Sequence, residues 1–276
     1  MFVWDGDPIA FTIGSLTLRW YGLFFSGGFV LGYFMMYAMF KRKGYQTDDL
    51  DKMLVYVFLG TVIGARLGHC LIYAPEYYLS HPLEILMIWQ GGLASHGGTV
   101  GVIVAFSIFI WRSKGKYRFF EIADMICVPI ALVCTFIRLG NFMNSEILGK
   151  PTDGPLGIVF ARLGEDFARY PAMLFEAGSY FITFIILALL YCLWTKRPQG
   201  MLLGLLLFCI FTSRFIIEPF KEEQADYSTN MALNVGQLLS IPFIVASVAL
   251  MAFLYLRDKK HQALAHKDSK SEQVTK

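Results

Sequence analysis

Apolar residues run along this chain in long stretches that are separated by short polar segments. Seven of these stretches approach the roughly 20 residues that a helix needs to cross a bilayer. They cover approximately residues 20–40, 53–72, 85–111, 122–139, 172–194, 201–217 and 232–256. The third is too long for one straight span, so we expect Glu84–Gly92 to lie along the interface and to turn in at Gly91 and Gly92. The pattern predicts an all-α polytopic membrane protein with about seven transmembrane helices.

The amino-acid composition also indicates a protein that lies in a membrane. Hydrophobic residues make up 56% of the chain and charged residues only 16%, with a mean hydropathy of +0.52. A soluble domain carries about 25% charged residues. No polar linker divides the chain, so we predict one integral membrane domain over residues 1–256. The polar residues 257–276 are expected to form a disordered cytoplasmic tail.

Lysine and arginine residues predict the orientation. They gather at 41–52, 112–118, 196–197 and 257–276, which fall on one side of a seven-span bundle. Positive residues favour the cytoplasmic side, so we place the N-terminus outside and the C-terminus in the cytoplasm. The largest outer segment, about 141–171, is rich in proline and glycine and contains a possible short strand at Leu156–Phe160. It predicts a small extracytoplasmic cap between spans four and five. The modest positive charge gives no support for nucleic-acid binding.

The stretch Arg138–Gly149, RLGNFMNSEILG, closes the fourth apolar run with an arginine, two asparagines, a glutamate and two glycines. A charged side chain at membrane depth costs about 2.5–3.5 kcal/mol on insertion scales. So many polar groups at one membrane boundary predict a functional site.

Two sets of glycines have the spacing of close helix packing in lipid, namely Gly60, Gly64 and Gly68, and Gly97 and Gly101. His96 stands beside the second set. Its imidazole could hydrogen-bond a carbonyl on another helix, or it could accept a proton from a nucleophile near neutral pH. Gly97 and Gly98 remove side chains beside it and would let a backbone or a lipid headgroup approach.

The other charges within the spans leave two interpretations open. Arg214 and Glu218 are four residues apart and share a helix face, which could be a buried ion pair holding two helices together. Alternatively, Arg138 and Arg214, at the outer ends of their spans, would suit a phosphate. Arg66 could join them or pair with Glu176.

The five cysteines favour neither a disulfide framework nor a zinc site, because they are odd in number, not closely spaced and placed in apolar spans: Cys70, Cys127, Cys134, Cys192 and Cys209. They are expected to be packing residues. A thiol that takes part in the chemistry would then belong to the substrate.

The stretch RLGNFMNSEILG resembles the signature of the bacterial phosphatidylglycerol–prolipoprotein diacylglyceryl transferase family, R-x-G-N-F-x-N-x-E-x-x-G, at every fixed position. Four further elements resemble the family in order and spacing, so the resemblance covers nearly the whole chain. They are Arg19–Gly22, Gly64–Gly68, Ser95–Gly98 and Arg214–Glu218.

The resemblance implies a multi-pass enzyme of the bacterial cytoplasmic (inner) membrane that carries out the first step of lipoprotein maturation. It would move the diacylglyceryl group of phosphatidylglycerol onto the lipobox cysteine of a prolipoprotein that still bears its signal peptide. A thioether forms and glycerol 1-phosphate is released. Membrane lipids would surround the enzyme, and the displacement needs no metal or organic cofactor.

The implied site residues follow the matched motifs. Arg138 and Arg214 would bind the phosphate and stabilise negative charge as the C–O bond breaks. His96 is the candidate base, although Glu146 or a phosphate oxygen could take the thiol proton. The remaining candidates would bind or admit phosphatidylglycerol: Tyr21, Asn141, Asn144, Gly149, Glu218, Gly97 and Gly98.

The chain departs from the family pattern at four positions that are commonly polar or aromatic. In Arg169–Glu176, which resembles R-H-P-x-Q-L-Y-E, the departures are Tyr170, Met173 and Phe175, and Ile210 stands where a tyrosine is common. Two other classes of membrane protein would also place arginines at headgroup depth or bind lipid. A lipid flippase would carry polar residues through to the cytoplasmic side, whereas the candidates here gather in the outer half. A non-catalytic lipid-binding relative would lack Arg138, His96 or Asn141, which are all present.

Overall fold

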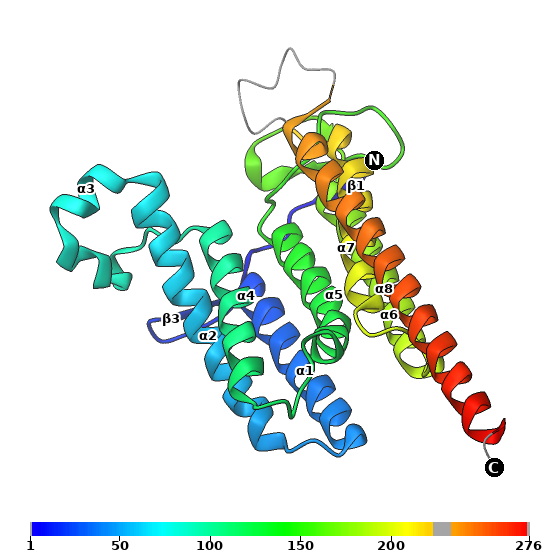
Figure 1. The fold of residues 1–276 in the computed structure, drawn as a ribbon. Helices are drawn as coiled ribbons and strands as arrows, with labels where there is room; N and C mark the ends of the chain where they lie inside the picture. The colour runs from blue at the N-terminus through cyan, green and yellow to red at the C-terminus, as the bar shows by residue number, and fades with distance from the viewer. Residues whose placement is uncertain (1, 223–232, 275–276) are drawn as a thin grey trace. The chain divides into compact units, whose positions relative to one another are not determined.

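The computed structural model describes residues 2–222 and 233–274, and helices dominate it (Figure 1). The chain forms two compact units. One comprises Met36–Ile122, and the other comprises Met1–Met35 together with Ala123–Lys276. Helices α1 (Trp20–Lys43) and α5 (Phe119–Met143) each run from one unit into the other.

The unit Met36–Ile122 is built on two apolar helices, α2 (Thr47–Gly68) and α4 (Ser95–Arg112). Between them the chain passes through a series of short elements: η1 (His69–Tyr73), α3 (Pro75–Ser80), η2 (Pro82–Leu86) and η3 (Ile88–Gln90). Gly91 and Gly92 then turn the chain with φ of 86° and 70°, values that glycine adopts without steric penalty. The third span therefore starts at Ser95, and the turn predicted at these glycines is confirmed.

The second unit carries the remaining long helices, which are α6 (Ala172–Leu193), α7 (Met201–Ile217) and α8 (Val235–Val274). Its short elements are β1 (Phe2–Trp4), β2 (Ile9–Ile13), β3 (Leu16–Arg19), β4 (Ile158–Phe160), η4 (Ala161–Leu163), β5 (Ala168–Arg169) and η5 (Glu218–Phe220). β2 and β3 form an antiparallel hairpin, while β4 lies between β1 and β5 in a three-stranded sheet. The strand predicted within Leu156–Phe160 is confirmed as β4.

Within the described residues, six helices are long and apolar enough to cross a membrane, and α4 is a shorter apolar helix. The prediction of an all-α polytopic membrane protein is therefore confirmed. Which side each terminus occupies stays a prediction. The seventh predicted span starts at Ala232, a residue outside the described part, and its helix begins at Val235.

The end of the chain differs from the predicted disordered tail, because α8 continues through the polar residues after Leu256 as far as Val274. The last two residues, 275 and 276, lie outside the described part. The sequence RDKKHQALAHKDSKSEQV contains neither glycine nor proline. Since an existing helix needs no new nucleation, such residues can extend it.

Helices α2 and α4 contact each other backbone to backbone through their glycines. A Cβ added at Gly64 would lie 2.7 Å from the Cα of Gly101, and one added at Gly68 would lie 2.7 Å from the Cα of Gly97. Small residues allow such close approach in lipid, where dispersion contacts drive helix association. The packing role predicted for both glycine sets is confirmed.

Asp124 joins α5 to the start of α7 in the second unit. Its carboxylate accepts hydrogen bonds from the backbone N–H groups of Gly200 (2.9 Å) and Leu203 (3.0 Å), and Arg197 Nε lies 3.7 Å away. The first N–H groups of a helix have no intrahelical partner, so a carboxylate there both satisfies donors and meets the positive end of the helix dipole.

We expect Asp124→Ala to lower the free energy of unfolding by about 1–3 kcal/mol, because buried donors would lose their acceptor. Unfolding of the purified protein in detergent, followed by circular dichroism, would measure this. Asp153→Ala, in the segment between α5 and α6, is the matched control and should leave the unfolding midpoint unchanged. Equal midpoints for both variants would contradict the assigned role.

The segment between α5 and α6 folds onto the start of the chain. Ile158, Phe160 and Met173 form a small buried core, against which Trp4 and Phe142 pack. The rings of Trp4 and Phe142 have centroids 4.4 Å apart. Arg169 donates to both carboxylate oxygens of Glu165, at 2.6 and 2.7 Å, and thereby holds the pKa of Glu165 below its ordinary value. The segment predicted to form the cap is therefore structured, and its location outside the membrane stays a prediction.

Candidate functional site

The chain turns back directly after the polar C-terminal end of α5, and two residues of this turn have positive φ. Ser145 and Ile147 have φ of 54° and 58°, which is uncommon for residues other than glycine. The backbone N–H of Glu146 donates to the carbonyl of Asn141 at 2.9 Å. The turn therefore brings the Glu146 side chain back against the last turn of the helix.

This turn lines up four of the predicted site residues by hydrogen bonds. Arg138 Nη1 donates to Asn141 Oδ1 at 3.0 Å, and Asn141 Nδ2 donates to Glu146 Oε2 at 3.0 Å. Asn144 Nδ2 donates to the other oxygen, Oε1, at 3.1 Å. Glu146 therefore fixes both asparagine amides, and Asn141 in turn fixes one edge of the Arg138 guanidinium.

Glu176, on α6, is fully buried and contacts two cations. Its Oε2 lies 2.6 Å from Arg138 Nε, and its Oε1 lies 2.6 Å from Lys221 Nζ. The sequence left open whether Glu176 pairs with Arg66, and the structure shows Arg138 and Lys221 as its partners. A buried carboxylate requires charge neutralisation, and here two side chains from elsewhere in the same unit supply it.

Arg214 and Glu218 lie close together at the end of α7, as their spacing predicts. Arg214 Nε is 3.9 Å from Glu218 Oε2, and the same oxygen is 3.2 Å from Lys221 Nζ. Of the two interpretations that the sequence left open, the ion pair of Arg214 with Glu218 is present, and it does not exclude phosphate binding by Arg214. Lys221 connects this ion pair to Glu176, which is also the partner of Arg138.

Two glycines of the motif are explained by what lies against them. A Cβ at Gly140 would lie 2.9 Å from Cδ2 of Tyr21, so the tyrosine ring packs directly on the α5 backbone. A Cβ at Gly149 would lie 2.5 Å from the carbonyl oxygen of Tyr170 and 2.6 Å from that of Phe220. Close backbone approach at Gly149 was predicted for the substrate, and the structure shows it for two segments of the protein itself.

Three of the four departures from the family pattern lie in or beside the apolar packing of this unit. Tyr170 and Phe175 form an aromatic cluster with Phe220, whose ring lies 5.3 Å from Tyr170 and 6.3 Å from Phe175 between centroids. Met173 is fully buried in the core beneath β4. Aromatic and thioether side chains thus fill these positions, and packing replaces polar contacts there.

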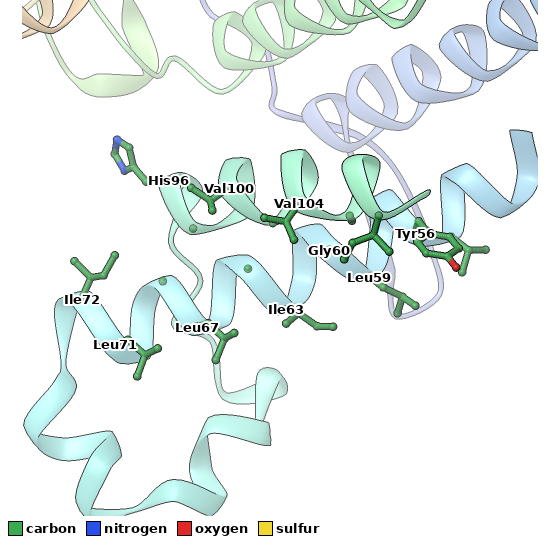
Figure 2. A pocket seen from close by; sticks show the side chains of 17 residues that line it. Tyr56, Leu59, Gly60, Ile63, Leu67, Leu71, Ile72, His96, Val100 and Val104 are labelled. Carbon is green, nitrogen blue, oxygen red and sulfur yellow. The ribbon is translucent and has the colours of Figure 1, made fainter. Parts of the chain in front are cut away.

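His96, Gly97 and Gly98 belong to the other unit, Met36–Ile122, at the first turn of α4. His96 is exposed and stands at one end of an apolar groove of about 670 Å³ that runs along α2 and α4 (Figure 2). Its ring points away from the aliphatic side chains along the groove, and Tyr56 stands at the other end. Gly97 packs on Gly64 and Gly68, whereas a Cβ added at Gly98 would lie 3.5 Å from Cβ of Ala65, an ordinary contact.

Arg66, whose partner the sequence left open, binds backbone carbonyls of its own unit through its guanidinium. Its side chain, 3% exposed, donates to four backbone carbonyls: Glu84 (2.5 Å), Ile85 (2.9 Å), Gly91 (2.5 Å) and Gly92 (3.3 Å). Its guanidinium also lies 5.1 Å from the Tyr78 ring centroid. The five donors of arginine suit such a cluster of acceptors, and Arg66 holds the segment between α2 and α4 in shape.

We expect Arg66→Lys to lower the free energy of unfolding by about 2 kcal/mol, although the charge is kept. The ammonium group of lysine is compact, so it cannot donate at once to the four carbonyls that the planar guanidinium of Arg66 reaches. Limited proteolysis between residues 73 and 94 would report the loosened segment. Cleavage as slow as in the wild type would show that these hydrogen bonds are dispensable.

Lys221 was missed by the sequence analysis. It lies after the last residue of η5, outside the apolar spans and the recognised motifs, in a stretch that reads as an ordinary polar boundary. Its position three residues after Glu218 was the available signal, since residues three apart meet on a helical turn. Its second contact, with Glu176, joins residues 45 positions apart and could not be read from spacing.

Comparison with known proteins gives one consistent result. A family model described as prolipoprotein diacylglyceryl transferase matches residues 8–253. The phosphatidylglycerol–prolipoprotein diacylglyceryl transferase of Tolumonas auensis is 49% identical over 251 residues, which are 91% of this chain and 96% of the relative. Proteins with the same name from Chloroherpeton thalassium and Bacteroides fragilis are 44% and 40% identical, over 90% and 91% of this chain and 92% and 94% of their own lengths.

Proposed function

This chain belongs to the prolipoprotein diacylglyceryl transferase family, and from that premise we propose how its residues carry out the reaction. The enzyme transfers the diacylglyceryl group of phosphatidylglycerol to prolipoproteins, the first step of lipoprotein maturation. The acceptor atom in our proposal is the thiol sulfur of the lipobox cysteine. The reaction takes place at the outer face of the bacterial cytoplasmic membrane, in the orientation that the basic residues favour.

The observation that carries the site assignment is the joined set of charges around Glu176. Arg138 and Arg214 each approach an acidic partner through Nε, at 2.6 and 3.9 Å, and Nη1 of Arg138 donates to Asn141 Oδ1. Terminal guanidinium nitrogens are well suited to the oxygens of a phosphate. We therefore assign Arg138 and Arg214 to the phosphate of phosphatidylglycerol.

In the proposed reaction the cysteine sulfur attacks the glyceryl carbon that bears the phosphate. A C–S bond forms while the C–O bond breaks, and the electron pair leaves on the phosphate oxygen of glycerol 1-phosphate. Arg138 and Arg214 stabilise the charge that develops on this leaving group. A thiol is a weak nucleophile until it is deprotonated, so a base must receive its proton.

We assign the proton to His96 in preference to Glu146. Both carboxylate oxygens of Glu146 already accept hydrogen bonds from Asn141 and Asn144. Both oxygens are therefore engaged in holding the two asparagine amides. His96 is exposed in the first turn of α4, and imidazole is the side chain that most often serves as a general base. Glu146 instead orients the two asparagines toward the headgroup.

The remaining candidates have supporting roles in the proposal. Tyr21, held against Gly140, lies beside the helix that carries Arg138 and is placed to contact the headgroup. Glu218 contributes to the substrate site through its contact with Arg214. Gly97 is required for the packing of α4 on α2, and we assign Gly98, next to His96 in the chain, to close approach of the lipid headgroup.

The test is release of glycerol 1-phosphate by the purified protein in phosphatidylglycerol vesicles, with and without a lipobox peptide. A peptide with serine in place of cysteine is the control. Release that requires both phosphatidylglycerol and the cysteine would establish the acceptor atom. Lipid movement between leaflets without release would favour a flippase, and binding without either would favour a lipid-binding protein.

A further inference from the structure

Lys221 lies between two acidic side chains at the centre of the charged set. Its Nζ is 2.6 Å from Glu176 Oε1 and 3.2 Å from Glu218 Oε2, and its side chain is only 11% exposed. A lysine held this closely by two carboxylates is fixed in position, which costs rotational freedom that a surface lysine keeps. Two charged contacts in a largely buried place outweigh that cost.

Each of these acids is also the partner of an arginine assigned to the phosphate. Glu176 contacts Arg138 and Glu218 contacts Arg214. Lys221 therefore connects the arginine of α5 to the arginine of α7. Arg138 and Arg214 lie on different helices, so this connection cannot be predicted from i, i+3 or i, i+4 spacing.

The backbone around Lys221 is held by the motif that follows α5. The N–H of Lys150 donates to the carbonyl of Phe220 at 2.8 Å, and the N–H of Glu222 donates to the carbonyl of Leu148 at 3.2 Å. Lys221 itself forms a β-bridge with Gly149. Because a side chain at Gly149 would collide with the Phe220 carbonyl, this glycine is what lets Lys221 reach its place.

Glu218 is held from its other side by the start of α8. A Cβ at Gly236, in the first turn of that helix, would overlap the Glu218 carboxylate. The missing side chain lets the carboxylate approach the positive end of the helix dipole. Glu218 thus has a defined position between Gly236 and Lys221.

The charges of these five side chains leave one positive charge in excess. Arg138, Arg214 and Lys221 are cations, and Glu176 and Glu218 are anions. Without Lys221 the set would be neutral, and each acid would have a single cationic partner. A buried carboxylate that loses one of its cationic partners is left with an undercompensated charge.

We propose that Lys221 is a positioning residue for the transfer: it holds Glu176 and Glu218 so that Arg138 and Arg214 turn their terminal nitrogens toward one lipid phosphate. The inference rests on the proposed function and adds to it the group that links the two arginines. Lys221 acts through its neighbours and need not touch the substrate.

The experiment measures kcat and KM for phosphatidylglycerol in the glycerol 1-phosphate assay, with protein that melts as the wild type does. Lys221→Met should lower kcat/KM about 30-fold, because two charged contacts are lost at once. Lys221→Arg should recover most of this loss. Lys196→Met, at an exposed lysine between α6 and α7, is the control and should behave as wild type.

A second pair of variants separates positioning from simple structural support. Glu218→Gln added to Lys221→Met removes the acid that has lost its lysine, and it should raise kcat/KM at least threefold above Lys221→Met alone. Gly236→Ala displaces the Glu218 carboxylate. It should lower kcat/KM in the wild type but cause little further loss in Lys221→Met, since residues of one network are not additive.

The outcomes distinguish this inference from the proposed function. A wild type that releases no glycerol 1-phosphate contradicts the proposed function itself. With an active wild type, unchanged kinetics in Lys221→Met would overturn the positioning role. So would a loss that neither Lys221→Arg nor the added Glu218→Gln relieves. If Lys221→Met does not fold, additive losses from Lys221→Arg and Gly236→Ala would overturn it equally.

Discussion

Replacement of Arg138 by alanine is expected to reduce transfer by about 10³-fold or more while the protein stays inserted in the membrane. Removal of one preorganised donor from a developing charge costs about 10²–10³ in rate. Here the change also takes one of the two cations from the buried Glu176 and the donor from Asn141. Both losses disturb groups beside the substrate.

Arg138→Lys should still reduce the rate by about 10²-fold, because a single ammonium cannot contact Glu176 with one edge and Asn141 with another. The glycerol 1-phosphate assay with phosphatidylglycerol vesicles measures both variants. Arg112→Ala, at the exposed end of α4, is the matched control and should retain the wild-type rate. Wild-type turnover in Arg138→Ala would remove this residue from the mechanism.

The second large effect is expected in the glycine contact of α2 with α4. Gly101→Ala should lower the free energy of unfolding by about 3 kcal/mol, since its Cβ would overlap the Gly60 carbonyl and lie 2.9 Å from the Cα of Gly64. Backbone atoms on both sides leave the methyl group no flexible neighbour to displace. The two helices would have to separate.

Gly98→Ala is the matched control for stability. Both glycines lie in α4, and alanine is the better helix former at either position by about 1 kcal/mol. The nearest atom to a Cβ at position 98 is 3.5 Å away, which is ordinary contact. Thermal unfolding in detergent should show a lower midpoint for Gly101→Ala and an unchanged or higher one for Gly98→Ala. Equal midpoints would contradict the packing assigned to Gly101.

The features that the sequence predicted correctly depend on residues that are close together in the chain. The apolar runs located the membrane helices to within a few residues at most ends, because solvation by lipid fixes their length and composition. The i, i+4 spacing of Arg214 and Glu218 predicted their proximity, and the glycine spacing predicted the packing of α2 on α4. Positive φ at Gly91 and Gly92 explains why the overlong third run breaks where it was expected to.

Contacts between distant residues could not be predicted in the same way. Glu176 was open to several cations, and its choice of Arg138 and Lys221 depends on how α5, α6 and η5 pack. Arg66 was expected to need a counter-charge, whereas carbonyls freed by the irregular backbone between α2 and α4 satisfy it. The β2–β3 hairpin was missed because its apolar residues merge with the start of the first apolar run.

The pairing of Arg138 with Glu176 also bears on how the chain assembles in the bilayer. Each of these residues, alone on its helix, makes insertion less favourable by about 2.5–3.5 kcal/mol. α5 and α6 are consecutive helices, so the two charges can meet as soon as both helices are in the membrane. Insertion of the two as a hairpin would avoid a stage in which either charge faces lipid alone. Arg138, which is proposed to bind the substrate, would then also guide, together with Glu176, the order in which the helices enter the membrane.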